Sequence, residues 1–269
     1  MKVYGTPNAR RDNLVLVCHA LTGTSAVADW WPALLAPNAL FDTNEYCVIG
    51  VDITGGTLSD VVRAQRETLT QHGFDRFRVV IGGSLGGMQV LQWALDAPER
   101  IDHAIVVGAH DHQSAMGIAF NAVQREAIAL DSARGLGLAR KIAMLTYKSE
   151  ELLNERHDRR PDRNDPSRFD IEGYLDLQAQ RFIDRFDAAT YVARTHLMDS
   201  FDVRHRAGEP TPELTFVGIC SDWLYRPQDV RAAAARFNAR YLELESTHGH
   251  DAFLAEPEKL NVTLNHVSP

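Results

Sequence analysis

The chain has 269 residues, of which 45% are hydrophobic and 24% are charged, a composition typical of a soluble globular protein. Its formal net charge of −8 argues against a nucleic-acid-binding surface. No apolar run approaches the roughly 18 residues of a membrane-spanning helix, and the N-terminus lacks the apolar core of a signal peptide.

Six short apolar runs predict β-strands. They are nearly continuous in Val, Ile and Leu, as in a parallel sheet that is covered on both faces. In chain order they are Leu14–His19, Tyr46–Val51, Arg78–Gly82, Ala104–Gly108, Leu214–Ile219 and Tyr241–Leu244. Helical patterns separate several of them, namely Ser59–His72, Gly87–Ala97, Pro227–Phe237 and Pro257–His266. Ser59 or Asp60 is the predicted N-cap of the first helix. This alternation predicts an open α/β sheet.

The region between the fourth and fifth predicted strands has helical periodicity and no strand pattern. Its predicted helices are Ile118–Leu130, Leu136–Tyr147, Ile171–Phe186 and Ala188–Met198. The segment Glu155–Asp170 is dense in charge and contains two prolines, which predicts a solvated loop. We therefore expect a core formed by residues 1–110 and 211–269, with residues 111–210 as a helical lid over the C-terminal edge of the sheet.

The three cysteines do not predict a disulfide framework. Cys18, Cys47 and Cys220 each lie in an apolar run, so buried, reduced thiols and a cytoplasmic protein are expected. None of the three has the spacing of a metal site.

The third predicted strand runs into Gly82-Gly83-Ser84-Leu85-Gly86, and a helical pattern follows at once. A Gly-x-Ser-x-Gly turn between a strand and a helix is the setting of a nucleophile elbow, in which a strained serine is raised above the sheet. The serine would then lie at the positive end of the helix. The alternative interpretation is a glycine-rich turn with a bystander serine.

An α/β hydrolase carries its catalytic triad in the chain order Ser, acid, His. Asp222 follows the fifth predicted strand and His250 follows the sixth, where this fold would need them. His250 would take the proton from Ser84, and Asp222 would hold the imidazole tautomer and stabilise the imidazolium. His248 is the competing base.

Two histidine pairs raise the question of a metal. His248 and His250 lack a third ligand with supporting spacing, so no metal is predicted there. His110-Asp111-His112 directly follows a strand end and could line the pocket, although a polar loop is the favoured interpretation.

An oxyanion hole needs backbone N–H groups near the nucleophile. One would come from Leu85, the residue after the serine. The other would come from the loop after the first predicted strand, where Leu21 is the best-placed donor.

Six segments are informative as an ordered set: His19–Gly23, Gly82–Gln89, Phe120-Asn121 with Arg125, Gly135–Arg140, Ser221–Leu224 and Gly249–Leu254. Together they closely resemble the homoserine O-acetyltransferase family, which comprises α/β-hydrolase-fold acyltransferases of methionine biosynthesis. The resemblance runs from about Val3 to Leu260.

The resemblance implies a two-step transfer. Ser84 would be acylated by acetyl-CoA, a co-substrate rather than a bound cofactor, and the hydroxyl of L-homoserine would then attack the acyl-enzyme with His250 as base. The family's substrate arginine matches Arg140, and a guanidinium suits an amino-acid carboxylate. Asp251 and Tyr147 match positions in the same substrate pocket. We expect small-molecule substrates, no nucleic-acid or membrane partner, and a homodimer.

The chain also departs from the family pattern. The glycine-rich segment after the second predicted strand is short, because Gly55-Gly56 passes almost directly to Thr57. The connections Asp131–Gly135 and His205–Pro212 are short as well, and the chain start lacks part of the usual first hairpin. A succinyl donor, serine as acceptor, an esterase-type serine hydrolase and a non-catalytic binding protein remain the alternative interpretations.

Overall fold

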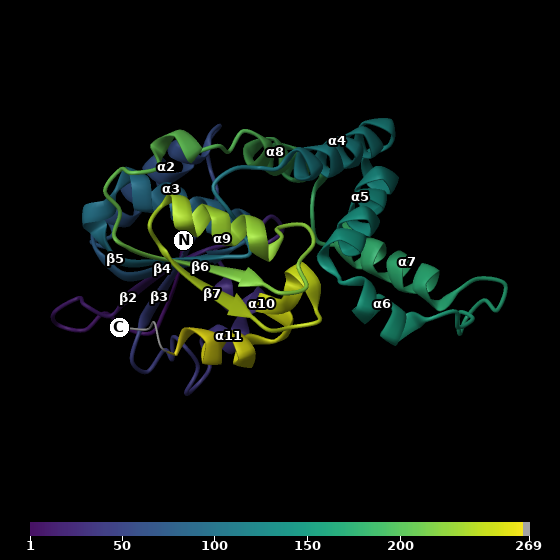
Figure 1. Cartoon of the computed structure of the whole chain (residues 1–269), viewed down its shortest axis with the longest axis horizontal. Helices are drawn as coiled ribbons and strands as arrows, with labels where there is room; N and C mark the ends of the chain where they lie inside the picture. Colours follow the sequence, from purple (N-terminus) through teal and green to yellow (C-terminus); the bar gives the residue numbers. More distant parts are fainter. Residues whose placement is uncertain (266–269) are drawn as a thin grey trace.

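The computed structural model describes residues 1–265, apart from the side chain of Ala133, and its centre is one seven-stranded sheet (Figure 1). The strands lie in the order β1-β3-β2-β4-β5-β6-β7, and every neighbouring pair is parallel except β1 with β3. Their bounds are β1 Lys2–Tyr4, β2 Leu14–Cys18, β3 Cys47–Val51, β4 Phe77–Gly83, β5 Ile101–Val107, β6 Glu213–Ile219 and β7 Arg240–Leu244. All six predicted strands are confirmed, and β1 was not predicted.

Helices cover both faces of this sheet, which explains why its central strands are apolar on both sides. Alternate residues of β2 belong to two separate cores: Leu14 and Leu16 pack with α2, α3 and α9, whereas Val15 and Val17 pack with α1, α10 and α11. These helices are α1 Val27–Trp30, α2 Leu58–Gln71, α3 Leu85–Asp96, α9 Pro227–Arg236, α10 Ala252–Ala255 and α11 Pro257–Leu264. The predicted helix after Pro257 is thus confirmed as far as Leu264, and His266 lies outside the described residues.

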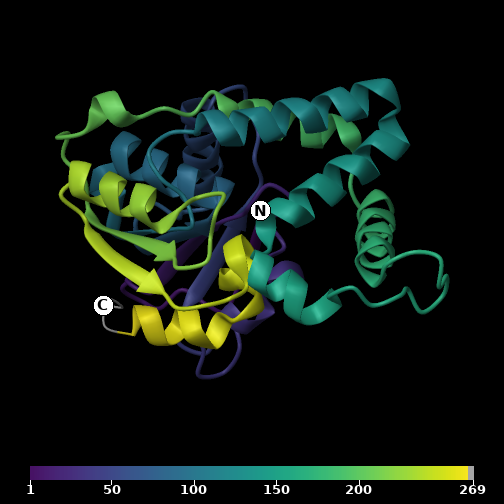
Figure 2. The same cartoon turned by 45° about the vertical axis from the view of Figure 1, so that its right-hand side comes forward.

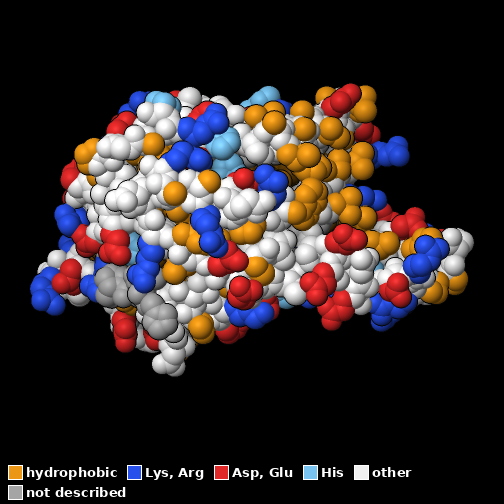
Figure 3. Space-filling model, viewed as in Figure 1, with side chains coloured by type: hydrophobic (Ala, Val, Ile, Leu, Met, Phe, Trp, Pro, Cys, Tyr) orange, Lys and Arg blue, Asp and Glu red, His pale blue; other side chains and the backbone are white. Residues whose placement is uncertain are grey.

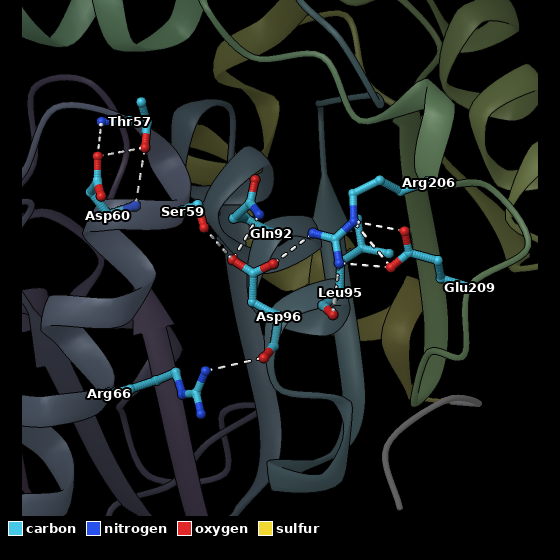
Figure 4. Close-up of polar contacts among 9 residues, drawn as sticks. All are labelled: Thr57, Ser59, Asp60, Arg66, Gln92, Leu95, Asp96, Arg206 and Glu209. Carbon is cyan, nitrogen blue, oxygen red and sulfur yellow. Dashed lines mark hydrogen bonds and ion pairs between the residues drawn. The ribbon is translucent and has the colours of Figure 1, made fainter.

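The N-cap prediction for α2 was wrong. Thr57 is the N-cap: its hydroxyl accepts a hydrogen bond from the Asp60 N–H, and the Asp60 carboxylate accepts one from the Thr57 N–H. This reciprocal capping box starts the helix earlier than expected. Ser59 instead uses its hydroxyl to donate to Asp96, the last residue of α3 (Figure 4).

A polar cluster around Asp96 ties the end of α3 to two other parts of the chain (Figure 4). One carboxylate oxygen accepts hydrogen bonds from Ser59 at 3.0 Å and Gln92 at 2.8 Å. The other accepts from Arg206 Nη1 at 2.6 Å, and Arg206 also donates to the carbonyl of Leu95. The helix that follows Ser84 is therefore anchored at its far end to α2 and to the segment that returns from the helical insertion.

Between β5 and β6 the chain forms five helices that project from one end of the sheet (Figures 1 and 2). They are α4 Ala115–Leu130, α5 Ser132–Tyr147, α6 Glu150–His157, α7 Asp170–Ile183 and α8 Ala188–Asp199. The four predicted helices are confirmed. The predicted loop was partly wrong, because Glu155–His157 belongs to α6; the Ser149 hydroxyl caps that helix by accepting from the Leu152 N–H.

The three cysteines are free, as expected. Cys18 and Cys47 are buried, whereas Cys220 follows β6 and is only partly buried, with its thiol 3.1 Å from the Ser246 carbonyl oxygen. Within residues 1–265, no helix is long and apolar enough to cross a membrane.

Candidate active site

Ser84 lies in the turn between β4 and α3. Its backbone has φ 58° and ψ −126°, a conformation that L-residues other than glycine rarely adopt. The turn is held by two backbone hydrogen bonds: the Ser84 N–H donates to the Val107 carbonyl, and the Ser84 carbonyl accepts from the Met88 N–H. The residue is 7% exposed. The strand, the strained turn and the helix have the backbone geometry of a nucleophile elbow, as the Gly-x-Ser-x-Gly pattern predicts.

The flanking glycines are required because the backbone segments here are in close contact. A Cβ atom on Gly86 would lie 2.2 Å from the carbonyl oxygen of Cys18, at the end of β2. A Cβ atom on Gly82 would lie 2.5 Å from the carbonyl carbon of Gly86. No side chain fits at either position without moving the backbone.

Asp222 and His250 meet beyond the C-terminal ends of β6 and β7, through a hydrogen bond of 2.7 Å between His250 Nδ1 and Asp222 Oδ2. The other oxygen of Asp222 accepts the backbone N–H groups of Leu224 and Tyr225, each at 2.9 Å. Both side chains are buried. These contacts fix the carboxylate, and the carboxylate fixes the imidazole ring.

The pKa of His250 is raised above its ordinary value. Burial acts to lower it, but the charge and the hydrogen bond of Asp222, with a smaller contribution from Asp251, outweigh that effect. The Nε2 atom is buried and has no hydrogen-bond partner among the described residues. It is therefore available to exchange a proton with a group bound in the adjacent cavity.

His248, the competing base, does not line this cavity. Arg156 donates to its Nε2 at 2.9 Å, and its Nδ1 lies 3.3 Å from the Glu256 carboxylate. Both nitrogens of His248 therefore face groups outside the cavity, which favours His250 as the base.

A cavity of about 540 Å³ opens beside Ser84, between the sheet edge and the helical insertion. Residues from distant parts of the sequence line it. Six of them are predicted site residues, namely Leu21, Ser84, Arg140, Tyr147, His250 and Asp251. The other two predicted site residues lie directly behind this lining: Asp222 bonds to His250, and Leu85 follows Ser84.

Two backbone N–H groups beside Ser84 are free to donate. Leu85 is the first residue of α3, so its N–H has no intrahelical partner. The Leu21 N–H makes no hydrogen bond to any of residues 1–265. The carbonyls of Leu21 and Gly23 are both held by Nη1 of Arg194 on α8, at 2.6 and 3.0 Å. The helical insertion thus fixes the loop that carries the predicted oxyanion donor.

The residues that the sequence predicts to bind substrate come mainly from α5. The Arg140 guanidinium lies 5.2 Å from the centre of the Phe182 ring and 5.9 Å from that of Tyr147. No carboxylate within residues 1–265 lies within 4 Å of it, so its charge is not neutralised by an ion pair. The Tyr147 ring is 5.5 Å from that of His250, and burial raises the pKa of Tyr147 to about 12. Its phenol therefore stays protonated at neutral pH.

Asp251 faces the same cavity and forms an ion pair of 2.9 Å with Lys148. The sequence did not predict a place at the site for Lys148, Arg185 or Arg194. Each is a basic residue in or beside a predicted helix, where a solvated face is the usual role, and no local motif distinguishes it. Only the packing of the insertion against the sheet places these residues at the site.

His110-Asp111-His112 does not line the cavity. Asp111 is fully buried, and its two oxygens accept from Nε and Nη2 of Arg236 at 2.6 and 2.8 Å. The three residues are close enough to hold a metal ion, but both carboxylate oxygens are already bound to a guanidinium. The segment is a loop, as favoured, yet it is buried, and it joins α9 to the end of β5.

The model of the α/β hydrolase fold family matches residues 13–257. The homoserine O-acetyltransferase of Gluconobacter oxydans (strain 621H) is 34% identical to the chain over 335 aligned positions, which cover 97% of the chain and 85% of that protein. The homoserine O-succinyltransferase of Neisseria gonorrhoeae (strain ATCC 700825 / FA 1090) is also 34% identical, over 96% of the chain and 86% of that protein.

Among solved structures, the homoserine O-acetyltransferase from Staphylococcus aureus has a TM-score of 0.83 and 28% identity, covering 98% of this chain and 86% of that one. Esterase E22 has a TM-score of 0.88 at 18% identity, covering 98% and 92%, and shows the shared fold alone. The 335 aligned positions of the Gluconobacter relative exceed the 269 residues of this chain, so the relative has residues inserted between matched segments. The chain belongs to the homoserine O-acetyltransferase family of α/β-hydrolase-fold acyltransferases.

Proposed function

We propose that this protein transfers an acetyl group from acetyl-CoA to the hydroxyl of L-homoserine through an acyl-enzyme on Ser84. One observation carries the proposal: the cavity that holds Ser84 and the free Nε2 of His250 also holds Arg140, a guanidinium without a carboxylate partner in residues 1–265. The first two residues supply acyl-transfer chemistry. The third supplies a site for the carboxylate of an amino-acid acceptor.

In the first half-reaction, the Ser84 hydroxyl attacks the thioester carbonyl and gives its proton to His250 Nε2. The N–H groups of Leu21 and Leu85 stabilise the negative charge on the carbonyl oxygen. The CoA thiolate leaves and takes the proton from His250. Asp222 stabilises the imidazolium that exists between these two proton transfers.

In the second half-reaction, the hydroxyl of homoserine attacks the acyl-enzyme and gives its proton to His250. The tetrahedral intermediate collapses, Ser84 leaves and recovers that proton, and the acyl product is released. Arg140 holds the carboxylate of homoserine, while Asp251 and Tyr147 complete the pocket for the amino acid. Because Arg140 binds the carboxylate, an amino acid is favoured over water as the acceptor. This preference distinguishes the proposed transferase from a simple esterase.

The donor and the acceptor are tested together in one assay. Purified protein is mixed with acetyl-CoA or succinyl-CoA, each with homoserine or serine, and CoA release and ester formation are followed. The proposal predicts the highest kcat/KM for acetyl-CoA with homoserine. A preference for succinyl-CoA or serine would reassign one substrate, and thioester hydrolysis that no amino acid accelerates would replace the proposal with an esterase.

We further propose that residues 111–210 act as a lid and that two copies pair through α4 and α5. Hydrophobic side chains gather over these helices (Figure 3), and four of them are 51–85% exposed, namely Met116, Val123, Leu130 and Leu138. Exposed apolar patches of this kind mark interaction surfaces, and a patch that matches its own copy forms a two-fold dimer. Light scattering after size exclusion tests the pairing, with Leu130→Asp expected to give monomer.

We also propose that the protein is cytoplasmic. Its cysteines are free thiols, and its proposed donor is an acyl-CoA.

A further inference from the structure

A second arginine lines the cavity beside Ser84, and the proposed reaction does not yet use it. Arg185 follows α7, is exposed to solvent, and forms part of the same cavity wall as Arg140. Its guanidinium carbon lies 5.3 Å from the centre of the Phe182 ring, and that of Arg140 lies 5.2 Å from the same ring. Two cationic side chains therefore contact one aromatic ring in one cavity.

Neither guanidinium is neutralised by a carboxylate within 4 Å, as far as the chain is described. Among the described residues, the Arg185 guanidinium makes one hydrogen bond, which is long: 3.4 Å from Nη1 to the carbonyl of Thr22, in the loop that also contains Leu21. Of the two acidic residues in the cavity wall, Asp251 is already paired with Lys148, and Asp29 is exposed. Because both guanidiniums lie against the same ring, the two cations repel each other. Burial of part of the Arg185 side chain and the charge of Arg140 lower the pKa of Arg185.

The repulsion is relieved when anions occupy the cavity. The amino-acid acceptor carries a single carboxylate, which Arg140 binds in the proposed reaction. The acyl donor is the other substrate, and it is anionic too: CoA carries phosphates, and a succinyl group adds a terminal carboxylate. Both present oxygens that a guanidinium binds by charge-assisted hydrogen bonds.

We propose that Arg185 binds an anionic oxygen group of the acyl donor, so that donor and acceptor each have their own guanidinium in one cavity. This inference rests on the proposed function. It assigns to Arg185 a phosphate of CoA or the terminal carboxylate of a longer acyl group, two sources of the same chemistry that different donors distinguish.

The test compares Arg185→Ala with the matched control Arg181→Ala, which removes an exposed arginine of α7 that does not line the cavity. KM is measured for acetyl-CoA, for succinyl-CoA and for S-acetyl-N-acetylcysteamine, a short thioester without phosphates. Thermal unfolding confirms that both variants fold. We expect Arg185→Ala to raise the KM for acetyl-CoA by about tenfold, with less than twofold change for the short thioester and for homoserine.

An effect confined to succinyl-CoA would identify the acyl carboxylate as the group bound and would equally support the inference. A rise in the KM for homoserine alone, or changes no larger than those of Arg181→Ala, would overturn it. If the wild-type protein fails to use homoserine, the proposed function fails, but donor KM values can still be taken from thioester hydrolysis. Calorimetric titration with CoA alone then tests Arg185 independently of any acceptor.

Discussion

The two walls of the cavity are built in different ways. On the sheet side, Ser84, Asp222 and His250 are buried and fixed by short hydrogen bonds and by a strained turn. On the side of the insertion, Arg140 and Arg185 are more exposed, contact aromatic rings, and have no carboxylate partner among residues 1–265. These contacts hold the sheet side in one geometry, as the proposed acyl transfer would require, whereas the two cations of the insertion lack a carboxylate partner and suit an anionic ligand.

One contact joins the two walls. Arg194 comes from the insertion, yet it holds the carbonyls of Leu21 and Gly23 in the loop after β2. The insertion therefore fixes part of the sheet side, in addition to the substrate binding that we propose for it. Substitutions on each side separate these two contributions, and we expect the largest effects on the sheet side.

Ser84→Ala should lower kcat by roughly 10⁴–10⁶, the scale seen when a triad nucleophile is lost. The variant should fold normally, because alanine keeps the Cβ atom of serine and removes only the hydroxyl. Steady-state CoA release measures the effect, and Ser59→Ala, which loses a hydroxyl outside the cavity wall, is the control. Near-normal turnover by Ser84→Ala would show that the reaction does not use Ser84 as its nucleophile.

His250→Ala should be about as damaging as the loss of Ser84, since members of a triad act as a unit. His248→Ala should retain most of the activity, because that ring faces Arg156 and Glu256 instead of the cavity. The two variants are compared by kcat with both substrates saturating. If His248→Ala lowers kcat more than His250→Ala does, the base is His248.

The pH profile of acylation should report His250. Only the neutral imidazole accepts a proton, so the rate should fall as the pH drops below the pKa of His250, which Asp222 helps to raise above its ordinary value of 6.5. Asp222→Asn removes the carboxylate charge, so this acid limb should move to lower pH, and kcat should fall by about 10⁴ because the wrong tautomer is favoured. If the acid limb of the pH profile lies at the same pH in Asp222→Asn as in the wild type, Asp222 does not act through His250.

Arg194→Ala should lower kcat by about 10- to 100-fold, less than the removal of an oxyanion donor itself, because the loop with Leu21 loses its anchor but keeps its N–H group. The KM for homoserine should change little. Arg194→Lys should recover part of the rate, since one of the two carbonyls can still be bound. A loss of thermal stability that fully accounts for the lost activity would instead indicate a purely structural role.

The sequence predicted the central strands because continuous apolar runs that are covered on both faces leave a strong signal. It missed β1, a short edge strand, because Lys2 and Val3 are exposed and form no apolar pattern. The elbow could be recognised from Gly82 and Gly86, whose contacts tolerate no side chain.

The sequence predicted that the insertion is helical, but it did not predict which arginines of the insertion line the cavity. No pattern in the sequence around Arg185 or Arg194 identifies the group that it contacts, which lies more than 160 residues away in the sequence. The ion pair of the buried Asp111 with the more exposed Arg236 could not be predicted for the same reason. Long-range packing decides these contacts, and a single sequence does not encode them in any nearby pattern. The triad and substrate roles were assigned from motif order and resemblance, and they remain predictions for experiment.

The central claim is that the sheet side carries out acyl transfer and that the insertion binds the acceptor. The most direct test follows the acyl-enzyme of Arg140→Lys by intact-mass measurement. The variant keeps the charge but loses the planar fork that binds a carboxylate at two points. Mixed with acetyl-CoA alone, wild type and Arg140→Lys should acquire one acetyl group at similar rates. On addition of homoserine, the wild type should lose the acetyl group rapidly, and the variant should need about tenfold more homoserine for the same rate. Equal impairment of both steps in Arg140→Lys would contradict the assignment of the acceptor to the helical insertion.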